Sequence, residues 1–274
     1  MRGLLTGVAA AVLAAALLTS CTDGEPAADP GPTTPIPRPS ATEAPRPEEG
    51  ACYRLSFEQA LAYTSDVAPA RCRRPHTSVT YAVGDLDNVV HGHLVAVDSR
   101  RVKEQVATTC PRLLGEYVGG SVEQRRLSML RAVWFTPTVE ESDAGAAWYR
   151  CDVIAVSGDG RLARLDGDLE GVLDTPEGRA RWGMCGTAEP GASDFERVLC
   201  SGEHSWRAVG VVTFPAGDYP GRRAAEARGQ EQCEDAGNAA AEDPLDFQWG
   251  YEWPTAEQWR AGTTYGLCWV PSEQ

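Results

Sequence analysis

The sequence is poor in positive charge and carries no familiar catalytic motif. All of its 25 basic residues except Lys103 are arginine, and 39 acidic residues leave a formal net charge of −14. This balance disfavours nucleic acid and anionic lipid head groups as partners of the domain at large. No G-x-S-x-G, H-E-x-x-H or phosphate-cradling loop is present. We therefore expect no catalytic residues, no cofactor and no nucleic-acid partner.

Long apolar runs are also missing, apart from one near the start. Leu4 to Leu18 is uncharged, too short to cross a ~30 Å hydrocarbon core comfortably, and typical of the apolar region of a signal peptide. The run ends in Leu18-Thr19-Ser20-Cys21, which resembles the bacterial lipoprotein box. The resemblance implies a signal peptide at residues 1–20 and a diacylglycerol on Cys21. An ordinary secretory signal with an incidental cysteine is the alternative.

Two acyl chains on Cys21 would anchor the protein stably, whereas one chain binds a membrane only marginally. We therefore expect a protein held by diacylglyceryl-Cys21 on the outer face of the cytoplasmic membrane. The rest of residues 21–50 is rich in proline and almost free of large apolar side chains. Such a segment cannot bury enough surface to offset its ordering entropy, so we expect a disordered tether.

Eight further cysteines fall into two sets of four with the same neighbouring sequence motifs. Cys72 precedes His76 in C-x3-H, and Cys200 precedes His204 in the same spacing. Pro137-Thr138 and Pro254-Thr255 each stand fourteen residues before the last cysteine of a set. The repetition predicts a tandem duplication. We expect module 1 at residues 51–157, a connecting segment at 158–181 and module 2 at 182–274.

Apolar periodicity predicts an α+β fold, in which each disulfide-stapled module has strands and one principal helix. Strands are expected at 77–83 and 146–156 in the first module, and at 206–214 and 263–270 in the second. The helices are expected after Ser99 up to Gly119-Gly120 and over 222–240. Pro111 should kink or divide the first helix. Residues 162–173 suggest a strand or hairpin between the modules.

An export signal and an even count favour disulfides over free thiols. Four cysteines allow three pairings, so spacing alone does not fix the connectivity. A copied module should carry its own bridges, and we prefer to pair the first cysteine with the second and the third with the fourth. The preferred bonds are Cys52–Cys72, Cys110–Cys151, Cys185–Cys200 and Cys233–Cys268.

The residues that end the second module form the pattern P-T-x-x-x-W-x-x-G-x-x-x-x-x-C, from Pro254 to Cys268. Together with C-x3-H before a strand and a helix with a central cysteine, this pattern resembles the actinobacterial septum formation domain. The first module keeps the proline, threonine, glycine and cysteine but has Ser142 where the second has Trp259. The resemblance implies an association with the cell envelope or the division site and implies no reaction.

His76 and His204 recur beside cysteines, so a metal site or a Cys-His catalytic pair must be weighed. An oxidised cysteine cannot serve in either role, and each motif would supply only two ligands. We expect these histidines, like Pro137 and Pro254, to be structural, and we expect no metal site. His91 and His93 and the aspartates of glycine-containing turns are better explained as loop chemistry.

Tryptophan is common in the folded part, and most of it should lie in the core. The best candidates for a binding surface are four aromatic residues near the end: Trp249, Tyr251, Trp253 and Trp259. The leading hypothesis is a non-catalytic lipoprotein that binds an envelope protein or a cell-wall component. A cell-wall hydrolase or other envelope enzyme is the alternative, and a purely structural spacer is a third.

Overall fold

The computed structural model describes residues 45–243 and 245–272 of the chain. The expected signal peptide, Cys21 and the tether as far as residue 44 lie outside these residues. Within residues 45–243 and 245–272, no helix is both long and apolar enough to cross a membrane.

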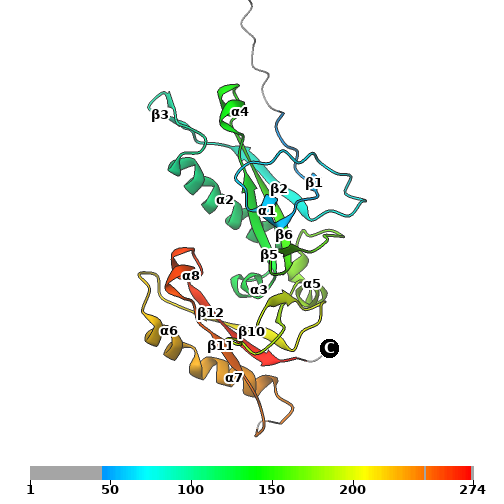
Figure 1. Cartoon of the computed structure of the whole chain (residues 1–274), viewed down its shortest axis with the longest axis vertical. Helices are drawn as coiled ribbons and strands as arrows, with labels where there is room; N and C mark the ends of the chain where they lie inside the picture. Colours follow the sequence, from blue (N-terminus) through cyan, green and yellow to red (C-terminus); the bar gives the residue numbers. More distant parts are fainter. Residues whose placement is uncertain (1–44, 244, 273–274) are drawn as a thin grey trace, which may run out of the picture. The chain divides into compact units, whose positions relative to one another are not determined.

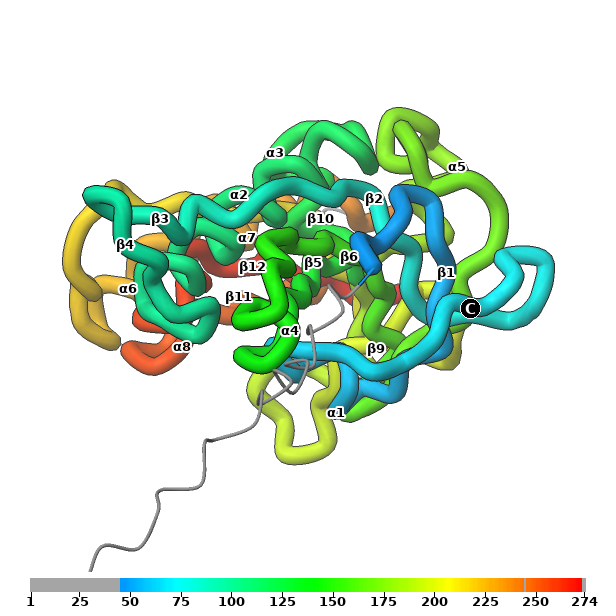
Figure 2. Tube along the Cα trace, turned by 90° about the horizontal axis from the view of Figure 1, so that it is seen from above, coloured from blue at the N-terminus to red at the C-terminus, as the bar shows by residue number. Residues whose placement is uncertain are grey.

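The first half of the described chain alternates strands and helices from residue 52 to residue 162. Its elements are β1 (Cys52–Tyr53), α1 (Phe57–Ala60), β2 (Ser78–Asp85), β3 (Val89–Val90), β4 (His93–Leu94), α2 (Arg100–Val118), α3 (Val122–Arg126), β5 (Leu130–Phe135), α4 (Val139–Asp143), β6 (Trp148–Gly158) and β7 (Arg161–Leu162). β3 and β4 form a small hairpin beside the start of α2 (Figures 1 and 2).

The second half begins with two short helical segments and continues in a similar order. Its elements are the 3-10 turn η1 (Val172–Asp174), α5 (Pro176–Arg181), β8 (Met184–Gly186), β9 (Arg197–Leu199), β10 (Trp206–Thr213), α6 (Arg222–Arg228), α7 (Gln230–Ala240), β11 (Gly250–Glu252), α8 (Ala256–Arg260) and β12 (Tyr265–Pro271). The fold is α+β, as the sequence predicts.

Each half builds one antiparallel sheet, and the two sheets share a strand order. The first runs β1-β2-β6-β5, with β7 paired to β6; the second runs β11-β12-β10-β8-β9. Reading the second from β8 gives β8-β10-β12-β11, which matches the first strand by strand. Both central pairs also carry an irregularity at the same place, opposite Cys151 in the first sheet and Cys268 in the second.

Four disulfides fasten these elements. Cys110–Cys151 joins α2 to β6, and Cys233–Cys268 joins α7 to β12. Cys52–Cys72 and Cys185–Cys200 close the loops that follow β1 and β8. These are the pairs preferred from the sequence. In both sheets the principal helices therefore cover one face, the face that bears the fourth cysteine of each set (Figure 1).

The two halves share a hydrophobic core. Leu114 and Val118 of α2 belong to the same buried cluster as Trp182, Trp206 and Trp269 of the second half. Backbone hydrogen bonds also cross between the halves, since the amide of Met129 donates to Trp182 over 2.7 Å and that of Met184 to Leu127 over 2.8 Å. The modules are therefore packed against each other rather than held on a flexible linker.

Pro111 does not divide the first helix, because α2 runs unbroken from residue 100 to 118. Of the two expected effects, a kink or a division, the division was wrong. Cys110 is bonded to β6, and Val106 and Leu114 are buried on the same face, so tertiary packing compensates for one missing helical hydrogen bond. The glycine pair that follows ends the helix as expected, with φ of +72° and +70°.

The expected strand over 162–173 is largely absent. β6 and β7 do form a hairpin at the Asp159-Gly160 turn, but its pairing extends no further than Val156 and Leu162. Beyond it, Leu165, Leu169 and Leu173 are buried in the shared core without joining either sheet. Their apolar spacing reflects burial in an irregular segment and not strand alternation.

Candidate functional site

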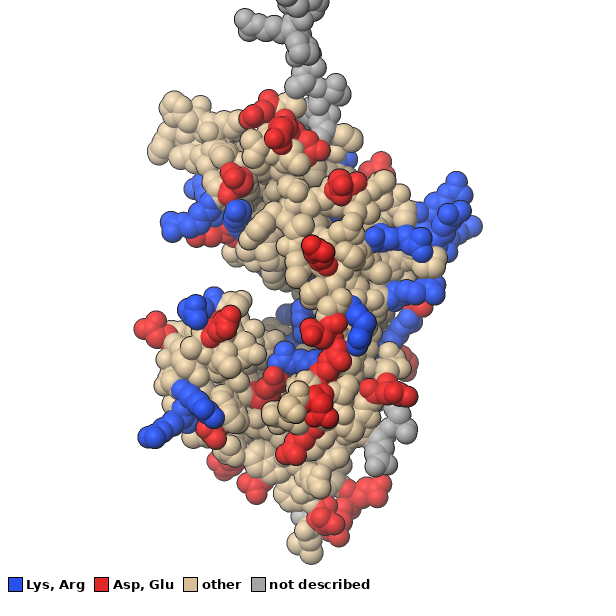
Figure 3. Space-filling view, in the orientation of Figure 1, with Lys and Arg blue, Asp and Glu red and all other residues tan. Residues whose placement is uncertain are grey.

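Three adjoining cavities of about 580, 630 and 110 Å³ open beside the second sheet, and we call them together the cleft. Glu252 and Gln258 line all three, so the cavities are parts of one depression. Residues of both halves contribute, including Met129 and Arg131 of the first and Phe195 and Arg197 of the second. Figure 3 shows the surface hollowed where basic and acidic side chains lie close together.

Strand alternation explains which side chains reach the cleft. Cys268 points to α7, and Tyr251 lies directly opposite it on the same face, so Glu252 and Leu267 point to the other face. In the first sheet Cys151 points to α2 with Trp134 opposite, so Arg131 also points away from the helix. The first cavity of the cleft is therefore bordered by the faces of both sheets that the principal helices leave open.

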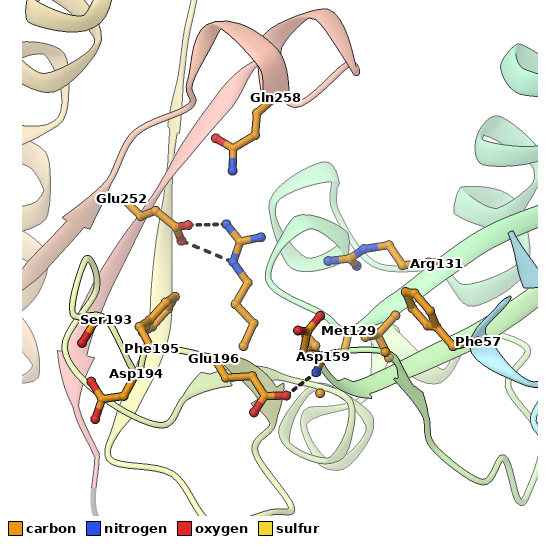
Figure 4. A pocket seen from close by; sticks show the side chains of 14 residues that line it. Phe57, Met129, Arg131, Asp159, Ser193, Asp194, Phe195, Glu196, Glu252 and Gln258 are labelled. Atoms are coloured by element: carbon orange, nitrogen blue, oxygen red, sulfur yellow. Dashed lines mark hydrogen bonds and ion pairs between the residues drawn. The ribbon is translucent and has the colours of Figure 1, made fainter.

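The centre of the cleft holds a bidentate ion pair between the two edge strands of the second sheet. Arg197 of β9 contacts Glu252 of β11 through Nη2 to Oε1 at 2.5 Å and Nε to Oε2 at 3.3 Å (Figure 4). Both side chains are partly buried. A two-point contact of this kind fixes the plane of the guanidinium and leaves its outer edge exposed to the cavity.

Arg131 of β5 points into the same cavity from the first half (Figure 4). Its Nη1 donates to the backbone oxygens of Ser128 and Leu130, both at 2.7 Å. Among the carboxylates in the described part of the chain, none forms an ion pair with it. Burial lowers the pKa of Arg131; Tyr265 opposes the shift, and the positive charge of Arg197 adds to it. The guanidinium remains charged, since arginine does not lose its proton in proteins.

Gln258 of α8 supplies an amide to the cleft. Its Oε1 accepts from the backbone amide of Thr255 at 2.8 Å, and its own backbone amide donates to Thr255 Oγ1 at 3.2 Å. This is a capping box. Because the oxygen is used by the cap, the side-chain nitrogen is the group that faces the cavity (Figure 4).

Acidic residues border the cleft on the side of the β6–β7 turn. Glu196 accepts from Arg161 at 3.0 Å and from the backbone amide of Asp159 (Figure 4). Asp159 and Asp194 line the same cavity. The first cavity thus places Arg131, a cation without an ion pair among the described residues, beside a mainly acidic border.

The second cavity of the cleft has aromatic walls. They are formed by Phe195, Tyr219, Tyr251 and Trp253 together with Pro190. Phe195 also packs edge-on against Trp269, with ring centroids 5.2 Å apart, so this wall is continuous with the core.

The four aromatic residues expected to form a binding surface do not form one. Tyr251 and Trp259 are buried. The Tyr251 hydroxyl donates to the carbonyl of Ala225 at 3.0 Å, and burial raises its pKa to about 12. Trp259 donates through Nε1 to Gly217 at 3.1 Å. These two side chains serve the packing of the sheet against α6 and α7. Trp249 and Trp253 are partly buried beside them, and of the four only Tyr251 and Trp253 reach the cleft.

His76 and His204 occupy matching places. In each, Nδ1 donates to a carbonyl two residues earlier, Arg74 at 2.9 Å and Gly202 at 2.8 Å. The adjacent cysteines are in disulfides. Within the part of the chain that the structure describes, no group of three or more His, Cys, Asp and Glu is placed to hold a metal ion.

Pro137 and Pro254 also match, because each is buried directly before a threonine that caps a helix. Thr138 caps α4 with Glu141 at the third position, and Thr255 caps α8 with Gln258. Ser142 is buried where Trp259 is buried in the second half. The repeated proline-threonine motif therefore marks the start of a one-turn helix that leads into the last strand.

The septum formation family model matches residues 49–268. The chain belongs to the septum formation family. The matched region includes both sheets and every residue of the cleft named above. One family domain therefore spans both modules, where the sequence pattern had suggested a copy of the domain in each. Comparison with curated proteins and with solved structures gave no match.

The two basic residues at the centre of the cleft of this septum formation domain were missed from the sequence. Arg131 interrupts the apolar run Met129 to Phe135, and Arg197 opens the short apolar strand before Cys200. A lone charge inside an apolar strand is the signal that could have identified both, because such a residue needs a partner or a cavity.

Proposed function

We propose that this protein is a non-catalytic binding protein of the cell envelope that acts in septum formation, and that the cleft is its binding site. Family membership supports the link with septum formation. The observation that carries the binding role is the cleft itself, in which Arg131 is fixed by backbone oxygens and has no carboxylate partner among the described residues. The ligand is an envelope protein or a cell-wall component.

We also propose that the protein is a lipoprotein. Cys21 follows an apolar run of signal-peptide length and is the one cysteine that stands before the folded part. A diacylglycerol on this residue would hold the domain at the outer face of the cytoplasmic membrane, with the proline-rich segment as its tether.

The arrangement of the cleft carboxylates favours binding over cell-wall hydrolysis. Glycosidases use two carboxyl groups that face each other across the bond to be cleaved. Here Glu252 is occupied by Arg197, and Glu196 accepts from Arg161 and from a backbone amide. These carboxylates hold the walls of the cleft in place.

We further infer that the two halves arose by duplication of one module. The support is the matching strand order, the matching disulfides, and the matching histidine and proline-threonine motifs.

The binding role can be tested by retention of envelope material on the full chain, purified in detergent and immobilised. Membrane and peptidoglycan fractions are passed over the wild type and over Arg197→Gln, which breaks the ion pair with Glu252. Arg112→Gln is the matched control, because Arg112 pairs with Glu116 at 2.5 Å on the exposed surface of α2. We expect Arg197→Gln to lose retained material and Arg112→Gln to keep it.

Equal retention by all three proteins would assign the interaction to another surface. Steady release of soluble fragments from peptidoglycan by the wild type would overturn the non-catalytic role. In cells, a tagged chain should gather at division sites and in the membrane fraction, and Cys21→Ala should leave the membrane fraction. A uniform distribution of the tagged wild type would contradict the link with the septum.

A further inference from the structure

The cleft contains a cation that the protein itself does not neutralise. No carboxylate of the described residues forms an ion pair with Arg131, although acidic residues outnumber basic ones in the chain. The Nη1 of Arg131 is fixed by two backbone oxygens, and the side chain is directed into the cavity (Figure 4). A guanidinium fixed in this way is organised in advance for a planar anion.

We propose that the cleft binds a peptide through a free carboxylate, which Arg131 and the amide nitrogen of Gln258 hold. This inference rests on the proposed function and specifies the ligand of the same site. Figure 4 shows the two side chains directed into one cavity from opposite halves of the domain. Arginine and a primary amide together supply the donors that a carboxylate accepts.

A singly charged carboxylate suits this cleft better than a phosphate. Asp159, Asp194 and Glu196 line the cavity, and Glu252 lies beside Arg197. A dianion would meet this acidic border with twice the charge of a carboxylate, and among the described residues that line this first cavity only the Arg131 guanidinium is without an ion pair. The same border would attract an ammonium group elsewhere on the ligand, as a peptide carries.

The aromatic cavity gives the ligand a second feature. It adjoins the charged cavity at Phe195, Glu252 and Gln258, and Tyr219 and Trp253 form its far walls. An apolar or aromatic side chain next to the carboxylate would be removed from water there. The ligand class is therefore a peptide that ends in an apolar residue with a free carboxylate.

The experiment compares three probes of similar size by calorimetry on the full chain in detergent micelles. They are N-acetylphenylalanine, which is a carboxylate, its neutral amide, and phenyl phosphate. We expect the carboxylate to bind about tenfold or more tighter than the amide, because a hydrogen-bonded ion pair of this kind contributes about that factor. We expect phenyl phosphate to bind more weakly than the carboxylate.

The decisive variant is Gln258→Glu. It keeps the cap on α8, because Glu141 performs the same capping at the matching position of α4. It replaces the amide nitrogen in the cleft by a negative oxygen, so the carboxylate probe should lose about tenfold or more in affinity. The matched control is Glu141→Gln, which makes the reverse exchange outside the cleft and should leave the affinity unchanged. Arg131→Gln should abolish the preference for the carboxylate over the amide.

Equal affinity for carboxylate and amide, or unchanged binding in Gln258→Glu, would overturn the assignment. Tighter binding of phenyl phosphate would also overturn it and point to a phosphorylated ligand. If no probe binds while envelope material is still retained in an Arg197-dependent manner, the ligand class is wrong and the proposed function stands. If neither is observed, both fail.

Discussion

Asp152 and Arg150 of β6 form a buried ion pair, and separating them should cost a large part of the stability of the domain. The two side chains are 0% and 4% exposed, and Arg150 Nε lies 3.1 Å from Asp152 Oδ1. Asp152 also accepts from Ser78 at 2.7 Å and Thr80 at 2.8 Å. The distance to Nε is that of an ion pair without hydrogen-bond geometry, and Nη2 of Arg150 has no hydrogen-bond partner among the described residues.

Two aromatic rings replace the missing partners of the guanidinium. It lies over the ring of Tyr53 at 3.8 Å and over that of Phe135 at 4.4 Å. Asp152→Ala would leave this buried cation without a counter-charge, at a cost of about 3–5 kcal/mol in the free energy of unfolding. Arg150→Ala should cost less, about 2–4 kcal/mol, because Asp152 can take up a proton while its two hydroxyl donors remain. In the double variant neither charge is stranded, so we expect a coupling energy of about 2–3 kcal/mol.

The pH dependence provides the check on this reasoning. Burial raises the pKa of Asp152, and Arg150 and the two hydroxyl donors oppose the shift. A carboxyl group whose folded pKa lies above its unfolded value of about 3.9 binds a proton more readily in the folded state. Its contribution to stability is therefore greatest when it is protonated and is lost as the pH rises from the unfolded pKa through the folded one. Arg150→Ala removes an opposing charge, so this loss should be larger in the variant than in the wild type.

Denaturant unfolding of the disulfide-bonded chain, repeated between pH 4 and pH 8, measures both effects. At each pH, the free energy of unfolding of the wild type is subtracted from that of Arg150→Ala. The contributions of all other carboxyl groups cancel in this difference. The reasoning is refuted if single and double variants add without coupling, or if that difference does not change with pH.

Three further changes test the hydrophobic core, the disulfides and a backbone contact. Trp269→Ala should cost about 3–5 kcal/mol in unfolding free energy, measured with urea, because the side chain is fully buried in the shared core. Removing Cys110–Cys151 by double alanine substitution should cost about 4 kcal/mol, against about 3 for Cys185–Cys200, since the sequence separations are 41 and 15; equal losses would contradict the loop-entropy account. Gly178→Ala should lower the melting temperature, because its Cβ would lie 1.8 Å from a backbone oxygen. Gly202→Ala, whose Cβ would meet its nearest neighbour at 3.4 Å, should not.

The elements predicted from the sequence are those with a strong local signal. Ser99 and the glycine pair after residue 118 mark the ends of α2 through a side-chain cap and a positive φ, both of which are local effects. The strands that carry Cys151 and Cys268 alternate clearly because one face of each is covered by a helix. The short strands β8, β9 and β11 were missed, since three residues are too few for a period to show.

The site depends on contacts that no local pattern records. The interpretation of Tyr251 and Trp259 as surface aromatics was wrong because their exposure is decided by α6 and the loop at Gly217, far away in sequence. Arg131 and Arg197 come together only after the two halves share a core. A sequence can indicate that a charge inside an apolar strand needs an explanation, but the explanation requires the tertiary structure.

Comparison of the two sheets explains why the cleft lies beside the second one. Register pairing aligns Phe135 and Arg150 of the first sheet with Glu252 and Leu267 of the second, all on the face away from the principal helices. In the first sheet Arg150 turns inward between two rings and is neutralised by Asp152. In the second sheet the place of Asp152 is taken by Trp269, which packs into the shared core, while the carboxylate stands at Glu252 on the edge strand. In the first half, the face away from the principal helix therefore contains a buried charge pair. In the second half, the carboxylate lies at the edge of the sheet, where it pairs with Arg197, and Arg131 lies opposite without a counter-ion. In both halves the helix-covered face carries the disulfide that joins the principal helix to the sheet. The difference in function between the halves is therefore expected on the opposite faces.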